Sequence, residues 1–383
     1  MKNKFDIFII GGGINGAGIA RDAAGRGFKV YLADKNKVGS ATSSWSSKLI
    51  HGGLRYLENY EFKLVRESLK EREIISKIAS NIIKPIPFII PYSKKLRSKW
   101  IIRIGLFLYD NIGGKTSFPK SKKIDLNKKY KGILKEKFSD GFKYYDAQID
   151  DKKLVEMNIE DAKKLGATIV ENNKVIEVKR NDFGWEITLE NGDLINSNVL
   201  INASGPWINE IIKNVIRVNT KKPIRLVRGS HIITKKLYEE EVAFTLQSDD
   251  NRIVFVIPYK NKYSLIGTTE VDVSKPDNPV ISDEEQKYLI DVVNNYFFTQ
   301  ISKGDIVETY SGIRPLIEDY KEASKVTRDY IFDLNIQNKN SPLLNIYGGK
   351  LTTYRKLSEK VIEKLSPYLP NTKVKNWTAS KPL

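Results

Sequence analysis

A glycine-rich turn close to the N-terminus constrains the fold of this chain more than any other feature of its sequence. The apolar run 5–10 is typical of a β-strand, and it leads directly into the pattern Gly11-x-Gly13-x-x-Gly16. In a dinucleotide-binding βαβ unit, the first glycine allows a tight turn, the second admits a diphosphate to bare backbone, and the third lets the helix pack closely on the strand. The turn therefore predicts a nucleotide site between a first strand and a first helix.

The residues after this turn follow in the order that such a unit requires. A helical pattern covers 15–26 and stops at Gly27, and a second apolar run at 29–33 ends at Asp34. A carboxylate about 20 residues beyond the glycines can accept hydrogen bonds from ribose hydroxyls. Asp34 suits the ribose of FAD and of NAD equally, so this unit alone leaves the nucleotide undecided.

Composition excludes several classes of protein. The 383 residues are enough for two domains, and they include no cysteine, which excludes disulfides, iron–sulfur clusters, thiolate nucleophiles and a cysteinyl flavin link. We predict no metal site. No secretory signal and no uncharged apolar run of spanning length is found, so we expect neither secretion nor a transmembrane helix.

The formal net charge of +18 is compatible with a nucleic acid, an anionic membrane surface or an anionic substrate. Lysine, asparagine and isoleucine are abundant throughout, so solvated lysine accounts for much of the excess. The densest basic stretch, 115–137, has few aromatic residues between its lysines and matches no known module. We therefore predict no nucleic-acid partner.

Segment 94–109 combines cations with a short apolar run bounded by Trp100 and Tyr109. The run is too short to span a bilayer, and this combination is what an interfacial helix requires. A buried helix with a charged lead-in explains the pattern equally well, so the sequence leaves both interpretations open.

The remaining pattern predicts an α/β part and an α+β part. Helical periodicity covers 60–82, 152–165 and 283–298, and short strands are predicted between 168 and 203. Alternating apolar and polar residues with turn signals over 224–269 indicate an antiparallel sheet.

We therefore expect a Rossmann-like nucleotide domain built from several chain segments, with an inserted domain based on an antiparallel sheet. The expected nucleotide domain covers 1–92, 145–223 and 305–383, and the expected substrate domain covers 93–144 and 224–304. The cleft between two such domains is where the chemistry should lie.

The only two histidines of the chain both lie in polar, glycine-containing surroundings. His51 follows a serine-rich stretch after the nucleotide unit, and His231 stands in Arg-Gly-Ser-His at the start of the antiparallel sheet. Imidazole is suited to proton transfer near neutral pH, although a lone histidine is more often structural. Each is therefore a candidate base.

Two later segments run from an apolar strand through small residues into a helix. In 198–207 the strand ends at Gly205, and in 345–355 it ends at Gly348 and Gly349. A helix N-terminus near Gly349 could place its positive end at a flavin pyrimidine ring, for which an NAD enzyme has no use. This second helix end favours FAD.

Three cations belong to these same motifs or to the sheet that follows them, namely Arg55, Arg314 and Lys350. Guanidinium groups bind phosphate or carboxylate bidentately, and a lysine adds a point charge. Together the three could hold a small anion, whereas any one alone would be an ordinary surface charge.

Taken together, these segments closely resemble the FAD-dependent sn-glycerol-3-phosphate dehydrogenases of the aerobic, quinone-linked kind. The resemblance extends from Phe5 to about Trp377 and is most specific in 46–56 and 348–355. The matching runs are 9–27, 41–60, 103–110, 203–207, 252–258, 266–270, 310–315 and 347–357. That family is similar in fold to the D-amino-acid oxidase group of flavoproteins, which implies an FAD domain and an antiparallel substrate domain.

The resemblance implies roles for individual residues. Those expected to bind FAD, non-covalently, are Gly11, Gly13, Asn15, Gly16, Asp34, Thr42, Ser43, Ser46, Ser47, Lys48, Leu49, Val175, Gly205, Gly349, Lys350, Leu351 and Thr352. Those expected to bind substrate are Arg55, Tyr56, Thr269, Arg314 and Lys350.

The implied reaction is the oxidation of sn-glycerol 3-phosphate to dihydroxyacetone phosphate, with the C2 hydride passing to FAD and the electrons then to a quinone. His231 is the first candidate base and His51 the second, and either Arg314 or Lys350 would polarise the C2 oxygen. Two alternatives remain: an oxidase that passes electrons to oxygen, and a non-catalytic flavin-binding scaffold at the membrane surface.

The resemblance also implies a cytoplasmic protein attached peripherally to the inner face of the cell membrane, through an anionic lipid surface. It leaves a homodimer open. Members of the family commonly continue into a C-terminal helical domain, whereas this sequence ends at Leu383, so we expect that domain to be absent.

Overall fold

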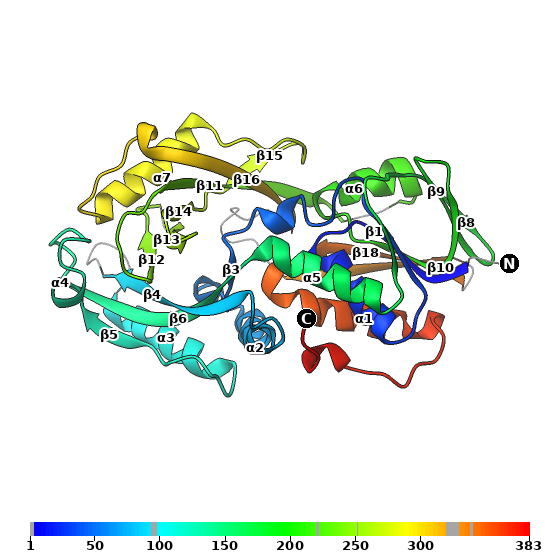
Figure 1. Cartoon of the computed structure of the whole chain (residues 1–383), viewed down its shortest axis with the longest axis horizontal. Coiled ribbons are helices and arrows are strands. Elements are labelled where there is room, and N and C mark those ends of the chain that lie inside the picture. The colour runs from blue at the N-terminus through cyan, green and yellow to red at the C-terminus, as the bar shows by residue number, and fades with distance from the viewer. Residues whose placement is uncertain (1–3, 93–97, 220–221, 251, 319–328, 338–339) are drawn as a thin grey trace.

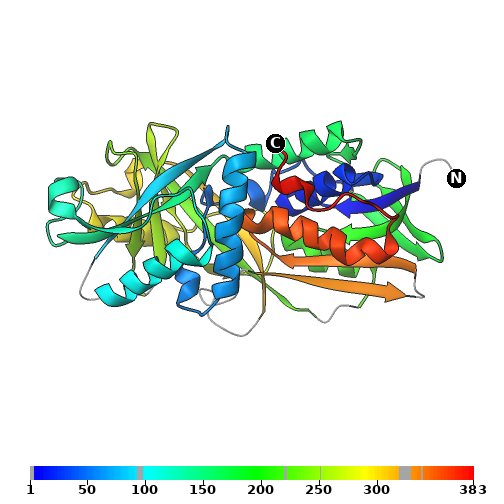
Figure 2. The same ribbon diagram turned by 90° about the horizontal axis from the view of Figure 1, so that it is seen from below.

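The computed structural model describes residues 4–92, 98–219, 222–250, 252–318, 329–337 and 340–383. Two sheets follow one another along the longest axis, and helix α2 (Phe62–Ile78) stands between them (Figure 1). The view from below shows α2 crossing the molecule between the two halves (Figure 2). The predicted fold class, a Rossmann-like part joined to a largely antiparallel sheet, is confirmed.

The first sheet contains the βαβ unit at the N-terminus. Its order is β17-β18-β10-β1-β2-β7, in which every neighbouring pair from β18 to β7 is parallel, and the β8-β9 hairpin extends from β10. The strands are β1 (Lys4–Ile10), β2 (Val30–Ala33), β7 (Thr168–Val170), β8 (Val175–Asn181), β9 (Gly184–Leu189), β10 (Leu194–Asn202), β17 (Tyr330–Gln337) and β18 (Asn340–Gly348).

Helices cover one face of this sheet because their small residues allow close packing. Helix α1 (Ile14–Gly25) packs between α5 (Asp151–Lys164) and α8 (Tyr354–Leu365). A Cβ at Gly18 of α1 would lie 2.7 Å from the ring of Tyr354, so glycine there brings α8 into contact. The short helix α6 (Ile208–Ile211) follows β10.

The second sheet has the order β15-β11-β14-β13-β12-β4-β6-β3, with β16 paired to β11 and β5 to β6. Its neighbours are antiparallel except for the short β12–β4 pair. The strands are β3 (Leu49–Ile50), β4 (Ile83–Pro91), β5 (Lys122–Asp125), β6 (Asp140–Ile149), β11 (Ile224–Lys235), β12 (Ala243–Gln247), β13 (Ile253–Tyr259), β14 (Tyr263–Gly267), β15 (Val271–Val273) and β16 (Ile306–Ile317).

Helices also flank the second sheet. Helix α7 (Asp283–Tyr296) starts with a capping box between Ser282 and Glu285 and packs on one face, whereas α3 (Lys99–Ile112) packs with α2 on the other. Helix α4 is a single turn (Leu126–Lys129). None of the helices in the described ranges is long and apolar enough to cross a membrane.

Sheet pairing divides the chain differently from the domain boundaries expected at 92, 145 and 305. Strands β4 and β16, together with residues 145–149 of β6, pair within the second sheet. The sequence analysis predicts no strand at β4, which contains Pro85 and Pro87, residues that are unfavourable in the middle of a sheet. Both prolines lie in the part of β4 that pairs only with β6. The other edge of this part pairs with no strand of the described residues, so no backbone N–H donor is needed there.

Candidate active site

The turn between β1 and α1 leaves no room for side chains at two of its glycines. Gly11 has a φ of 103°, and a Cβ there would lie 2.7 Å from the carbonyl oxygen of Ala203. A Cβ at Gly16 would lie 1.9 Å from the carbonyl oxygen of Gly11. Gly13 is the N-cap of α1. Bare backbone at a helix N-terminus is the arrangement that binds a diphosphate.

Asp34 closes this end of the site after β2. Its Oδ2 accepts a hydrogen bond from the N–H of Gly12 at 2.6 Å, and its Oδ1 accepts one from the N–H of Asn36 at 2.8 Å. Burial raises the pKa of Asp34, although these two donors and Lys35 oppose the rise. A carboxylate held in this way keeps acceptor capacity for ribose hydroxyls on both oxygens.

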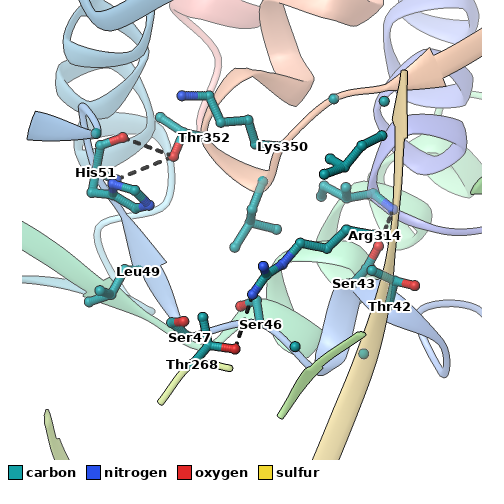
Figure 3. A pocket seen from close by; sticks show the side chains of 18 of the residues that line it. Thr42, Ser43, Ser46, Ser47, Leu49, His51, Thr268, Arg314, Lys350 and Thr352 are labelled. Atoms are coloured by element: carbon teal, nitrogen blue, oxygen red, sulfur yellow. Dashed lines mark hydrogen bonds between the residues drawn. The ribbon is translucent and has the colours of Figure 1, made fainter. Parts of the chain in front are cut away.

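A cavity of about 980 Å³ extends from this turn to the second sheet. Figure 3 shows His51, Arg314 and Lys350 at the cavity, on three separate segments of the chain. Most of the residues that the sequence singles out contribute to its wall. They are Gly11, Gly13, Asn15, Asp34, Thr42, Ser43, Ser46, Ser47, Leu49, His51, Arg55, Tyr56, Val175, Gly205, Arg314, Gly349, Lys350, Leu351 and Thr352.

The segment around residues 42–48 is held on both sides. Ser43 Oγ accepts a hydrogen bond from the N–H of Ile14, and Thr42 Oγ1 donates one to the carbonyl of Ile313 in β16. Ser46 Oγ donates to Asp151 at 2.7 Å. The segment therefore joins α1, α5 and the second sheet along one wall of the cavity.

Four expected site residues lie outside the cavity wall. Gly16 is inside α1, and Lys48 turns away to pair with Asp151 at 2.6 Å. Thr269 is buried and donates a hydrogen bond to Glu285 at 2.5 Å. His231 lies behind Ser47. These positions indicate that the four support the site from outside it.

His51 follows β3 directly and contributes to the cavity wall. The backbone N–H of His51 donates a hydrogen bond to Thr352 Oγ1 at 3.2 Å, and the same hydroxyl lies 3.3 Å from the backbone carbonyl oxygen of His51 (Figure 3). Burial, together with the cations of Lys350 and Arg72, lowers the pKa of His51 to about 3. The imidazole is therefore neutral at physiological pH and able to accept a proton.

His231 is almost completely buried in β11. Its Nε2 lies 2.9 Å from Ser47 Oγ, and its ring stacks on Tyr310 with 4.7 Å between centroids. The imidazole has space because a Cβ at Gly267 would lie 2.1 Å from it. Burial, with smaller contributions from Arg314 and Lys48, lowers the pKa of His231 well below its ordinary value. His231 does not line the cavity, whereas Ser47, which contacts its Nε2, does.

The cations occupy two places in the cavity. Lys350 Nζ donates to Ser68 Oγ at 2.7 Å and lies 4.6 Å from the ring centroid of Tyr56, the residue that follows Arg55 in sequence. Arg314 projects from β16, and its Nη2 donates to Thr268 Oγ1 at 3.0 Å. Positive charge therefore faces the cavity from the 3₁₀ helix Leu54–Leu57, from β16 and from the segment after β18.

The sequence did not single out several polar residues of the wall. Glu270 lies 3.7 Å from Arg314, and Thr245, Gln247 and Asp146 come from β12 and β6. A signal existed for Glu270, since it ends the run 266–270 that carries part of the family resemblance. No local motif marks the others, because tertiary pairing alone brings their strands to the cavity.

The cavity fits FAD by three features. Glycines whose Cβ atoms would clash form the diphosphate turn, a carboxylate lies at the ribose position, and a second helix begins beside Gly349, at the 3₁₀ helix Leu351–Thr353 followed by α8. The volume is at the upper end of the range for cofactor and ligand pockets. Fold and site thus define a dinucleotide-binding oxidoreductase.

A family model described as "FAD dependent oxidoreductase" matches residues 6–354. The chain belongs to this family, and its cofactor is FAD. Because the match covers most of the chain and includes both sheets, the family assignment applies to the whole cavity.

Three curated relatives show similar levels of identity. The glycerol-3-phosphate dehydrogenase of Pseudomonas aeruginosa is 44% identical over 100% of this chain and 75% of its own length. The aerobic glycerol-3-phosphate dehydrogenase of Escherichia coli is 43% identical over 96% of this chain and 74% of its own length. The D-erythritol 1-phosphate dehydrogenase of Brucella abortus is 42% identical over 99% of this chain and 76% of its own length.

Solved structures show the same fold at lower identity. The glycerol-3-phosphate dehydrogenase from Bacillus halodurans, complexed with FAD, has a TM-score of 0.76 and 24% identity over 99% of this chain and 67% of that chain. The L-alpha-glycerophosphate oxidase from Mycoplasma pneumoniae, with FAD bound, has a TM-score of 0.76 and 16% identity over 99% of both chains.

Proposed function

We propose that the protein oxidises sn-glycerol 3-phosphate to dihydroxyacetone phosphate in the cavity between the two sheets. One observation carries the proposal: a neutral imidazole and three cations share a cavity wall with the FAD cradle. The relatives named glycerol-3-phosphate dehydrogenase support it, since two of them are 43–44% identical over at least 96% of the chain.

Arg55, Arg314 and Lys350 provide the charge that a phosphate ester requires. Guanidinium groups bind phosphate bidentately, and the Lys350 ammonium adds a point charge beside Tyr56. Binding energy from the phosphate would then orient C2 for reaction. Arg314 is also close to Glu270, whose carboxylate can accept hydrogen bonds from the substrate hydroxyls.

His51 is the base that the geometry favours, because its side chain lines the cavity whereas His231 lies behind Ser47. Neutral His51 would take the proton of the C2 hydroxyl. FAD supplies the acceptor for the C2 hydride when it is bound. A phosphate dianion near Lys350 would offset one of the two cations that depress the pKa of His51, and so strengthen the base.

We propose a division into two parts that follows the sheets. The FAD part would keep the first sheet with α1, α5 and α8, and the substrate part would take the second sheet, including β4, β6 and β16. Because β3 and β16 carry residues on both sides of the cavity, the two parts would share the site.

Helix α3 supports peripheral attachment to an anionic membrane. Its residues Ile102, Leu106 and Tyr109 are buried, whereas Trp100 is 73% exposed and Phe107 is 66% exposed. Arg103 on the same helix is exposed as well. Aromatic and aliphatic side chains beside a cation suit the interface of an anionic leaflet. Residues 94–97, which completed the segment expected at the interface, lie outside the described residues.

The same helix supports a quinone as the electron acceptor. Ile101 and Ile104 of α3 are exposed at the surface and also line the cavity. An apolar acceptor dissolved in the bilayer could therefore approach the cavity along α3. Oxygen is the alternative acceptor, and the substrate and FAD residues would be the same for both.

D-erythritol 1-phosphate is a second candidate substrate. The relative with that name is 42% identical over 99% of this chain, nearly the identity of the glycerol-3-phosphate dehydrogenases. The longer polyol would place its additional hydroxyl among the polar wall residues Thr245, Gln247 and Glu270. A comparison of kcat/KM for the two phosphate esters decides between them.

The phosphate-binding role is tested by Arg314→Ala in a dye-linked assay. We expect the apparent KM for sn-glycerol 3-phosphate to rise about tenfold or more while FAD stays bound, because the ionic contact of the half-buried Arg314 with the phosphate is lost. Arg225→Ala is the matched control, since Arg225 pairs with Asp272 on the same sheet and does not line the cavity.

Glycerol provides the complementary test with the unmodified protein. It has the same reacting carbon but no phosphate, so we expect turnover with glycerol to be very poor. Equal rates with glycerol and its phosphate ester, or an unchanged KM in Arg314→Ala, would contradict the assignment of the anion pocket.

A further inference from the structure

A buried hydroxyl connects helix α3 with the residue next to His51. The N–H of Gly52 donates a hydrogen bond to Tyr109 Oη at 2.7 Å. Tyr109 Oη in turn lies 2.8 Å from both carboxylate oxygens of Asp146 in β6. All three residues are buried, and Asp146 also contributes to the cavity wall, so removal of one partner leaves a buried polar group without its hydrogen bond.

Arg72 of α2 completes this group. Its Nη1 donates to Asp146 Oδ1 at 2.7 Å and to the carbonyl of Tyr145 at 2.7 Å. The network therefore joins α2, α3 and β6 to the short segment that carries His51. Burial raises the pKa of Asp146, with Arg72 as the main opposing influence. Two buried charges are retained here although apolar residues could fill the same space.

The segment after His51 has little freedom to relax. A Cβ at Gly52 would lie 2.5 Å from Leu69 and 2.7 Å from the Tyr109 ring, and Gly53 has a φ of 77°. On the other side, Thr352 Oγ1 contacts both the N–H and the carbonyl of His51. His51 is thus fixed from the cofactor side by Thr352 and from the α3 side by Tyr109.

We propose that Tyr109, supported by Asp146 and Arg72, is a positioning residue that sets the place of the His51 imidazole in the cavity. The proposal rests on the role proposed for His51 above. Tyr109 and Arg72 do not line the cavity, and the Tyr109 hydroxyl acts on His51 through the backbone of Gly52. Loss of the Tyr109 hydroxyl would leave the Gly52 N–H without this acceptor, and displacement of a reacting group by about 1 Å can slow catalysis a hundredfold.

The test is Tyr109→Phe, measured by stopped-flow reduction of the bound flavin with sn-glycerol 3-phosphate under anaerobic conditions. We expect the limiting reduction rate to fall about tenfold or more, with the apparent Kd for substrate and the FAD content little changed. The matched control is Tyr238→Phe, which removes a buried hydroxyl that donates to Val242 and Val256 in another part of the second sheet. Thermal midpoints of both variants separate loss of stability from loss of rate.

A second variant keeps the test decisive if Tyr109→Phe loses FAD. Arg72→Met combined with Asp146→Asn removes the charge pair together, so no lone charge stays buried, and it leaves Tyr109 in place. We expect this variant to slow flavin reduction as well, even though loss of the Arg72 cation raises the pKa of His51 and by itself would favour proton transfer. The proposal is overturned if either FAD-loaded variant reduces at the wild-type rate, or if neither binds FAD while Tyr238→Phe does, because the network would then serve the fold. Failure of the wild-type protein to reduce its flavin would instead refute the proposed function.

Discussion

Asp34 shows at the scale of single residues how the backbone prepares a cofactor contact. Both carboxylate oxygens accept N–H donors from the chain itself, which fixes the side chain at the place where we expect the ribose to bind. We expect Asp34→Ala to weaken FAD binding, because charge-assisted hydrogen bonds contribute about 1.5–3 kcal/mol each.

This prediction is measured by FAD titration of the apoprotein. Asp6→Ala is the control, since Asp6 also binds a backbone N–H, that of Lys29, near the opposite end of β1 from the cavity. Equal FAD affinity in Asp34→Ala and Asp6→Ala would show that Asp34 does not contact the ribose.

His51 should make the folded protein sensitive to acid. Its folded-state pKa is lowered to about 3, whereas the ordinary value of histidine is 6.5. Above about pH 6.5 the imidazole is neutral in both folded and unfolded chains. Below that pH the unfolded chain binds a proton that the folded chain does not, so stability falls with pH until about pH 3.

We expect His51→Gln to remove part of this acid sensitivity. Between about pH 7.5 and about pH 5.5 the wild-type protein should lose about 1 kcal/mol more stability than the variant, measured from denaturant midpoints. His231→Gln should also reduce the acid sensitivity of the protein, since burial likewise lowers the pKa of His231 in the folded state. Parallel pH profiles for wild type and His51→Gln would contradict the lowered pKa of His51.

Single residues also show where sequence reasoning succeeds. The turn glycines and Asp34 are recognisable because their functions depend on fixed local spacing. Tyr109 contacts Gly52 from 57 positions away in sequence, Asp146 contacts Tyr109 from a further 37 positions away, and Glu270 reaches Arg314 across the sheet. Such groups have no local signature, because their strands and helices meet only in the folded chain.

Helix α3 illustrates the same limit at the scale of secondary-structure elements. Its sequence is compatible with a buried helix and with an interfacial one, and the structure shows features of both, since one face packs on the second sheet while Trp100 and Phe107 are exposed. Strand β16 pairs with β11 along its whole length, and this pairing places Arg314 on a strand opposite Val227.

We expect Trp100→Ser with Phe107→Ser to weaken sedimentation with anionic vesicles at low salt. Exposed aromatic side chains supply the apolar contact with the bilayer, and cations near the surface contribute about 1 kcal/mol each. Phe183→Ser with Phe298→Ser is the control, because these exposed side chains lie on other elements. If the α3 variant sedimented as well as the parent, α3 would not be the contact surface.

At the scale of the whole molecule, two sheets supply different parts of one reaction. The first sheet and its helices provide the FAD cradle, and the second sheet contributes Arg314 and the polar wall, with α2 between the two. The fold class was predictable from the nucleotide turn and the alternating strands. The division of strands between the sheets was not, because β4 and β6 gave no clear strand signal and pairing alone assigns them.

An anaerobic titration tests most directly the claim that this cavity oxidises a polyol phosphate with FAD. The purified protein should be yellow, and acid should release its FAD, because the chain has no cysteine for a cysteinyl link. About one equivalent of sn-glycerol 3-phosphate should bleach the flavin and yield about one equivalent of dihydroxyacetone phosphate, since one hydride reduces one flavin. A quinone should then restore the colour faster than air. Flavin that stays oxidised with sn-glycerol 3-phosphate, yet bleaches with dithionite, would contradict the account.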